Sequence, residues 1–269
     1  MSMKALGLVL ACLLLTVSGC GSDDDGGGSS SSSGTGSDLE VAEEGTLTVC
    51  SDTPYKPFEY PDKSAPTGYT GFDIELMQAI ADGLELELVV QDTGFDALQS
   101  GLTLASGNCD IAASAMTITE EREQNLDFSD PYYDSEQSLL VPTDSSIASI
   151  DDLAGMKVGV QQGTTGKTYA EENVPEDTEI IAFPSDAEMF SALQGGQVDA
   201  LLQDLPVNLV HTEDDEYAIV EKYDTGESYG FAVAEEGHDN LLAAVNEQLQ
   251  ALRDDGTYQK IYDSYFATS

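Results

Sequence analysis

The sequence predicts an α/β protein built from two similar lobes, and three observations lead to this prediction. From Gly45 onward, short apolar stretches alternate with amphipathic stretches, an order typical of parallel sheets covered by helices. The run Phe95-Asp-Ala-Leu-Gln-Ser-Gly101 returns as Phe190-Ser-Ala-Leu-Gln-Gly-Gly196, and each copy leads through an aspartate into an apolar strand. About 220 residues remain once the first 44 are set aside, enough for two lobes with their own cores.

The elements of the first round follow from hydrophobic periodicity and from capping residues. Asp73 is expected to cap a helix that runs to about Ala81, and Gly83 is expected to end it. A second helix is expected at 95–104, and Thr119 is expected to cap a third whose first turn holds two glutamates. Strands are expected in the same stretch at 47–51, 84–90 and 110–113.

The second round repeats this order. Gly163-Thr-Thr165 opens a helix that ends near Glu172, and further helices are expected at 187–193 and from about Pro206. Strands are expected at 158–160, 180–183 and 198–202. Near the C-terminus, apolar residues recur at helical spacing and predict one more helix: Leu241, Val245, Leu249 and Leu252.

The N-terminal stretch is expected to act in export and anchoring. Residues 1–19 have the features of a signal peptide, with an early lysine and an apolar stretch too short to span a bilayer. Val17-Ser-Gly-Cys20 resembles a bacterial lipobox, which implies cleavage before Cys20 and a diacylglycerol on its sulfur. The alternative is a plain secretory leader with an incidental cysteine. Residues 20–44 start almost only with Gly, Ser and Asp, which predicts a lipidated cysteine on a disordered tether.

The charge balance excludes several classes of partner. Asp and Glu number 51 against 9 Lys and Arg, a net charge of -42 that repels nucleic acid and anionic lipid headgroups. We interpret this acidity as a solvated surface adapted to salt or to a charged cell envelope. With two histidines and no spare cysteine cluster, the sequence predicts no metal site, no histidine-based triad and no cofactor.

Two cysteines, Cys50 and Cys109, remain in the folded part after Cys12 leaves with the leader. An oxidising compartment permits a bridge between them. Cys50 ends one expected strand and Cys109 begins another, so in neighbouring parallel strands the two thiols would lie near opposite ends, beyond disulfide reach. A bridge and two buried free thiols therefore both stay open.

The most informative residue is Arg122, one of only two arginines in the chain. Thr117 follows an expected strand end, and Arg122 comes five residues later, near enough to return to the same loop. A hydroxyl, backbone N–H groups and a guanidinium together suit a carboxylate. The alternative is a surface arginine paired with Glu121 or Asp127.

Residues at other strand ends complete a candidate site. Gly163-Thr-Thr165 offers free amides at a helix N-terminus, which suit an anion, although a capped helix start explains it equally well. Asp204 can pair with an ammonium group, can cap the following helix, or can do both. Asp52, followed by Tyr55, suits a polar or cationic side chain. Tyr55 and Phe95 fit a pocket or the core equally well, while Phe58 is expected in the core.

These motifs together resemble the polar amino-acid-binding proteins of ABC importers, solute-binding protein family 3, which include glutamine and lysine/arginine/ornithine binders. The likeness covers nearly everything from Gly45 to Phe266. Four runs carry it: Ser51-Asp-Thr-Pro-Tyr-Lys-Pro-Phe-Glu59, Gly71-Phe-Asp-Ile-Glu75, Met116-Thr-Ile-Thr-Glu-Glu-Arg122 and Asp127-Phe-Ser-Asp-Pro-Tyr-Tyr133. Gly163-Thr-Thr165 and Asp199-Ala-Leu-Leu-Gln-Asp204 extend it.

The resemblance implies a role for each candidate residue. Arg122 would clamp the α-carboxylate of a free amino acid with help from Thr117 and Thr165, and Asp204 would take its α-ammonium group. Asp52 would meet the side chain, which Tyr55 and Phe95 would enclose. Ala115 lacks a hydroxyl that some relatives carry, and Gln161 or its neighbour stands where some place a charge, which leaves the ligand open. The remaining implied ligand-binding residues are Ser114, Met116, Gly163 and Thr164.

The resemblance also implies the fold and the partners. It implies a two-lobed type II periplasmic-binding-protein fold, two sheets joined by two hinge strands, with lobe 1 at 45–133 and 230–269 and lobe 2 at 134–229. The expected protein is a monomer without catalysis that captures glutamine or a basic amino acid for the membrane subunits of an importer. It is expected outside the cytoplasmic membrane, or on its periplasmic side, and meets the bilayer only through Cys20.

Two rival functions fit the same scaffold. One is an enzyme similar to periplasmic cyclohexadienyl dehydratases, which needs only a well-placed acid in the cleft. The other is a sensor domain that passes a ligand signal to a partner protein. Turnover of prephenate or arogenate distinguishes the first from stoichiometric binding of an unaltered amino acid.

Overall fold

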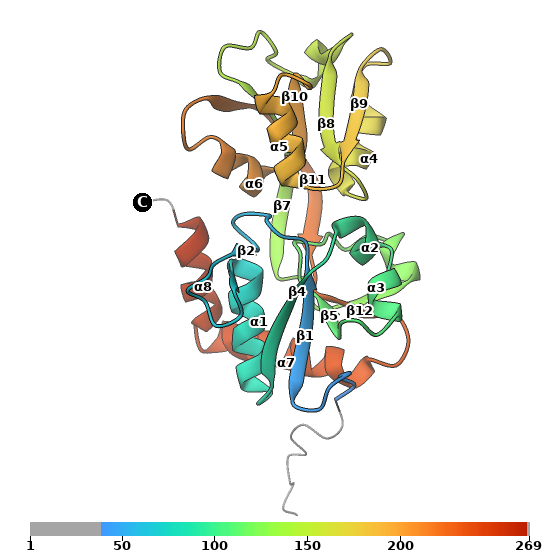
Figure 1. Ribbon diagram of the computed structural model, residues 1–269, viewed down its shortest axis with the longest axis vertical. Helices are drawn as coiled ribbons and strands as arrows, with labels where there is room; N and C mark the ends of the chain where they lie inside the picture. The colour runs from blue at the N-terminus through green and yellow to red at the C-terminus, as the bar shows by residue number, and fades with distance from the viewer. Residues whose placement is uncertain (1–38, 268–269) are drawn as a thin grey trace, which may run out of the picture. The chain divides into compact units, whose positions relative to one another are not determined.

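The computed structural model describes residues 39–267, which form one unit of packed sheets and helices (Figure 1). The predicted signal peptide, Cys20 and most of the predicted tether lie outside the described residues. The prediction of a disordered tether as far as residue 44 was wrong at its end, because Leu39 and Val41 pack against a buried apolar cluster and the Ala42 N–H donates to Asp110. Two five-stranded sheets organise the unit, with strand orders β4-β1-β5-β12-β6 and β11-β7-β10-β8-β9. Across residues 39–267, none of the helices has both the length and the apolar character needed to cross a membrane.

The first sheet and its helices form what we call lobe 1. Strands β1, β4 and β5 are parallel, and β12 runs antiparallel to β5 and β6. Its strands are β1 (Thr46–Ser51), β4 (Glu87–Asp92), β5 (Ile111–Ala112), β6 (Leu126–Phe128) and β12 (Ala232–Ala234), and a separate pair is β2 (Tyr60–Pro61) with β3 (Tyr69–Thr70). Its helices are α1 (Phe72–Gly83), α2 (Phe95–Gln99), α3 (Leu102–Ala105), α7 (Asp239–Asp254), α8 (Thr257–Phe266) and the 3-10 turn η1 (Arg122–Gln124).

The second sheet and its helices form lobe 2. Strands β8, β9 and β10 are parallel, while β7 is antiparallel to both β10 and β11. Its strands are β7 (Tyr133–Pro142), β8 (Lys157–Gln161), β9 (Glu179–Phe183), β10 (Ala200–Asp204) and β11 (Tyr217–Tyr229). Its helices are α4 (Thr165–Asn173), α5 (Asp186–Gln194), α6 (Leu205–His211) and the 3-10 turn η2 (Ile150–Leu153).

The strands β7 and β11 connect the lobes. They pair from Tyr133 with Tyr229 at one end to Pro142 with Tyr217 at the other, and Figure 1 shows them running from one lobe into the next. Each sheet carries its own buried apolar clusters, as expected for lobes with separate cores. All four apolar residues predicted for the C-terminal helix are buried on α7 against lobe 1.

Three local predictions in lobe 1 were wrong. Asp73 does not cap α1: the cap position is Gly71, and the Asp73 carboxyl turns inward, where it is buried. The helix expected at 95–104 is two short helices, because Gly101 between them adopts a left-handed φ of 77°. The helix expected after Thr119 is only the single turn η1, although the Thr119 hydroxyl does accept from the Arg122 N–H.

The inference that Cys50 and Cys109 lie out of disulfide reach was also wrong. Strands β1 and β5 are parallel neighbours as supposed, with Cys50 opposite Ala112. Cys109, however, precedes β5 and need not follow the line of that strand. The two residues form a disulfide with their Cα atoms 5.8 Å apart.

Candidate functional site

A small cavity lies where strand ends of the two lobes meet, and the space in it that is open to water is about 20 Å³. Parallel strands bring polar residues together at their carboxyl ends, which is where ligands bind in open α/β sheets. Every predicted ligand-binding residue lines this cavity except Met116 and Gly163. From lobe 1 come Asp52, Tyr55, Phe95, Ser114, Ala115, Thr117 and Arg122, and from lobe 2 Gln161, Thr164, Thr165 and Asp204.

Arg122 is buried at one end of the cavity, with 5 % of its surface exposed. Its Nη1 donates to the Thr117 carbonyl at 2.6 Å and its Nη2 to the Gly163 carbonyl at 2.9 Å. The guanidinium carbon lies 5.2 Å from the centre of the Phe95 ring. No carboxylate in residues 39–267 lies within the 4.0 Å limit of an ion pair with it, so the surface-pair alternative was wrong.

Burial without a paired carboxylate makes Arg122 a strong anion receptor. Burial lowers the pKa of its guanidinium to about 10, while Asp204 and Glu227 act against that change. It therefore stays charged at neutral pH. A guanidinium has five N–H donors, so after its two carbonyl contacts it can still bind a carboxylate.

Asp204 forms the opposite pole of the cavity and is 8 % exposed. It stands at the cap position of α6, but its side chain makes no capping bond. Its Oδ2 instead accepts from the hydroxyls of Tyr55 at 2.8 Å and Tyr229 at 2.6 Å, and its Oδ1 accepts from Gln137 Nε2 at 2.5 Å. Burial raises the pKa of its carboxyl, a rise that these hydrogen bonds oppose.

A third polar group, Asp52, lies across the lobes from Gln161. Gln161 Nε2 donates to Asp52 Oδ2 at 2.6 Å and to the Pro184 carbonyl at 3.2 Å. Both amide protons are thereby used, so the pair presents oxygen acceptors to the cavity. Burial raises the pKa of Asp52 to about 6, which leaves it mostly ionised at neutral pH.

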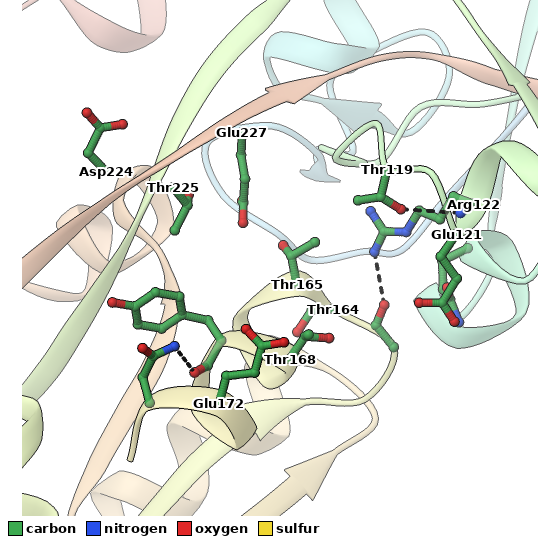
Figure 2. Close-up of a pocket in the computed structure, with 14 residues that line it drawn as sticks. Thr119, Glu121, Arg122, Thr164, Thr165, Thr168, Glu172, Asp224, Thr225 and Glu227 are labelled. Carbon is green, nitrogen blue, oxygen red and sulfur yellow. Dashed lines mark hydrogen bonds between the residues drawn. The ribbon is translucent and has the colours of Figure 1, made fainter.

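Two predicted site residues lie elsewhere. The side chain of Met116 is completely buried in the apolar cluster behind the cavity, together with Phe95 and Leu98. Gly163 lines a neighbouring open groove, where its carbonyl receives the Arg122 guanidinium (Figure 2). This groove and the cavity share Arg122, Thr164 and Thr165, so one opens beside the other.

Three residues on the connecting strands were missed. Gln137 donates to both Asp204 and Glu227, and Tyr229 donates to Asp204. Glu227 Oε2 also lies 3.4 Å from the Thr117 hydroxyl, and its side chain points toward Thr165 in Figure 2. Sequence patterns gave no signal for them, since each reads as an ordinary strand residue and only the antiparallel pairing of β7 and β11 brings them to the site.

The cavity thus presents a positive pole and a negative pole with a mainly aromatic and small-residue wall between them. Thr117 and Thr165 stand beside the positive pole, with their hydroxyl oxygens 3.5 Å apart. In the described part of the chain, no set of three or more His, Cys, Asp or Glu residues is arranged to hold a metal ion. The arrangement is complementary to a small molecule with a carboxylate at one end and a cation at the other.

Comparison with known proteins gives one family and a consistent group of relatives. The family of bacterial extracellular solute-binding proteins, family 3, matches residues 47–268. A probable histidine-binding protein of Neisseria gonorrhoeae is 32 % identical over 272 residues, covering 98 % of this chain and 96 % of that protein.

Solved structures show the same likeness. An ancestral arginine-binding protein bound to glutamine has a TM-score of 0.77 at 36 % identity, covering 84 % of this chain and 100 % of that one. An ancestral amino acid-binding protein, a precursor of cyclohexadienyl dehydratase, has a TM-score of 0.73 at 39 % identity over 82 % of this chain and 95 % of that one. The predicted two-lobed periplasmic-binding-protein fold is confirmed.

Proposed function

Because the chain belongs to family 3 of the bacterial extracellular solute-binding proteins, we propose that it captures a free polar α-amino acid for an ABC importer. The observation that carries this proposal is the pair of unmatched poles, Arg122 and Asp204, which line one cavity. Each is a buried charge without an oppositely charged partner within ion-pair distance in residues 39–267. Such charges are costly unless a ligand neutralises them.

A zwitterion neutralises both charges at once. Its carboxylate takes the free donors of Arg122, with the Thr117 and Thr165 segments beside it, and its ammonium group meets Asp204. Asp204 keeps its hydrogen bonds to Tyr55 and Tyr229, which orient the carboxylate without neutralising it. Non-ionic ligands leave both charges unmatched, so the site discriminates against them.

Asp52 and Gln161 contact the side chain of the ligand, and the oxygens that they present to the cavity are hydrogen-bond acceptors. An acidic side chain is excluded by repulsion from Asp52. Side chains that donate hydrogen bonds fit, and these are the amide of glutamine and the cationic groups of the basic amino acids.

The same proposal includes the anchor and the location. Cleavage before Cys20 and lipidation of its sulfur would hold the binding domain at the outer face of the cytoplasmic membrane, where a monomer meets the importer subunits. Mass spectrometry of the mature N-terminus tests this part. A Cys20→Ala variant is expected to appear in the soluble fraction instead of the membrane fraction.

A thermal-shift screen of the purified protein against the free amino acids, followed by calorimetry, tests the proposed function. Glutamine and the basic amino acids are expected to raise Tm and to bind one per chain, while aspartate and glutamate give no shift. A screen in which no amino acid raises Tm contradicts the proposal.

The enzyme alternative is supported by one feature, the raised pKa of Asp52, about 6, in a chain whose fold is similar to that of a precursor of cyclohexadienyl dehydratase. Incubation with prephenate and arogenate under the same conditions separates the two functions. Binding of unaltered amino acid without turnover of either compound supports transport.

A further inference from the structure

Two carboxyl groups, Glu59 and Asp73, are completely enclosed in lobe 1 just behind the cavity wall. Both residues are 0 % exposed, and neither lines the cavity. The Asp73 backbone N–H donates to the Phe58 carbonyl at 3.0 Å, so the two acids stand on adjacent chain segments. Nothing in the proposed ligand contacts uses either of them.

The two carboxyls hold a segment that does line the cavity. Ser114 Oγ donates to Glu59 Oε1 at 2.6 Å, and the Ala115 N–H donates to Asp73 Oδ2 at 2.8 Å. Ala115 has a φ of 43°, a conformation that a residue with a Cβ keeps only when its surroundings impose it. Ser114 Oγ also accepts from the Asp52 N–H at 3.0 Å, so the contacts continue from Glu59 to Asp52.

The second oxygen of each carboxyl has no donor. Neither Glu59 Oε2 nor Asp73 Oδ1 receives a hydrogen bond from an N–H or hydroxyl in residues 39–267, and no basic side chain in that range forms an ion pair with either acid. The ionisable groups that face the pair are all acids or phenols: Asp52, Asp204, Tyr55, Tyr132 and Tyr258. The Tyr132 hydroxyl donates to Asp73 Oδ2 at 2.7 Å, which leaves Oδ1 unsatisfied.

Two adjacent buried negative charges without a cation are unfavourable, and each unsatisfied oxygen adds to the cost. One proton removes half of the charge and supplies a donor where the pair has none for its unsatisfied oxygens, as in other pairs of carboxyls that share a site. We propose that Glu59 and Asp73 share a single proton, and that this pair positions Ser114, Ala115 and Asp52 at the ligand cavity.

The direction of the pKa shifts agrees with this arrangement. Burial raises the pKa of both carboxyls, and the neighbouring Asp73 adds to the rise at Glu59. Between the ordinary carboxyl value and the raised value, the folded protein holds a proton that the unfolded chain has released. Stability therefore falls as pH rises through this window and levels off above it.

The test is the pH dependence of unfolding for the wild type and Glu59→Gln, whose amide takes up no proton itself and offers Asp73 an N–H donor in place of the shared proton. Between pH 5 and 7, the unfolding equilibrium constant of the wild type is expected to rise by up to tenfold per pH unit relative to the variant. Glu87→Gln, an exposed substitution in the same lobe, is expected to follow the wild type. Identical pH profiles for wild type and Glu59→Gln overturn the proposal.

Two further measurements separate positioning from a merely structural role and cover a variant that fails to fold. Amino-acid affinity of the wild type is expected to fall at alkaline pH, where the pair loses its proton. The affinity of Glu59→Gln, which has no shared proton to lose, is expected not to fall for this reason. Proton uptake on refolding the wild type at pH 7, measured in unbuffered solution, needs no variant, and no uptake contradicts the proposal.

The positioning role rests on the proposed function, but the shared proton does not. If no amino acid binds and the unfolding profiles still differ, the proton pair stands and the proposed function fails. If amino acids bind and the unfolding profiles coincide, the proposed function stands and the shared proton is refuted.

Discussion

Replacing Arg122 by alanine is expected to abolish amino-acid binding. Two of the guanidinium donors go to the carbonyls of Thr117 and Gly163, and the Arg122 side chain, which has three further donors, lines the cavity. A bidentate contact to a ligand carboxylate consists of two charge-assisted hydrogen bonds, each contributing about 1.5–3 kcal/mol. Losing about 3–6 kcal/mol corresponds to an increase in Kd of about 10² to 10⁴-fold.

Calorimetry with glutamine and with arginine measures this loss, and circular dichroism shows whether the fold is kept. Arg253→Ala is a matched control, because Arg253 is the only other arginine, is exposed, and contacts the Pro131 carbonyl away from the cavity. Arg122→Lys keeps the charge but not the planar fork and is expected to fall between the two. A folded Arg122→Ala protein whose Kd stays within tenfold of the wild type refutes the reasoning.

Three other perturbations have expected outcomes. Asp52→Asn should remove any preference for basic amino acids over glutamine. In the wild type, affinity for arginine should fall as pH drops below about 6, where Asp52 becomes protonated. An unchanged order of amino-acid affinities in calorimetry contradicts this role of Asp52. Because the net charge is -42, Tm should rise between 0.1 M and 2 M salt as repulsion among the acidic side chains is screened. A constant Tm would show that this repulsion does not limit stability. Removing the disulfide in a Cys50→Ser/Cys109→Ser protein opens a 59-residue loop and should lower the free energy of unfolding by about 4 kcal/mol, as measured by chemical denaturation. Equal stability of the two proteins contradicts a stabilising disulfide.

The fold could be predicted from the sequence because its two rounds obey simple periodicity. Apolar strands alternate with amphipathic helices, and both repeated runs are helical: the run at Phe95 opens α2, and the run at Phe190 forms the second half of α5. Element boundaries were less certain: the strand expected at 84–90 is β4 at Glu87–Asp92, because Glu85 with a φ of 58° turns the chain first.

The candidate site could be predicted where its residues follow strand ends, as Asp52, Thr117 and Asp204 do. The groups that support these residues could not. Gln137 and Tyr229 reach Asp204 only through the antiparallel pairing of distant strands, which no local pattern encodes. Asp73 looked like a helix cap, because the sequence does not reveal that its side chain turns inward to meet the Ala115 N–H.

The cysteine pair shows the same limit. The expectation from neighbouring strands treated Cys109 as part of a regular strand, whereas the chain departs from that line before β5 begins. Spacing along a sequence fixes distances only inside regular elements. The route of the chain between them depends on packing, here on the apolar cluster that contains both cysteines.

Calorimetry with three forms of one ligand tests the central claim most directly. The free amino acid, its α-amide and its N-acetyl derivative share a side chain but differ in charge at one pole each. We expect the free form to bind at one per chain and each blocked form to bind at least tenfold more weakly, because Arg122 or Asp204 then loses its counter-charge. Equal affinity for all three forms would show that neither Arg122 nor Asp204 binds a charged end of the ligand.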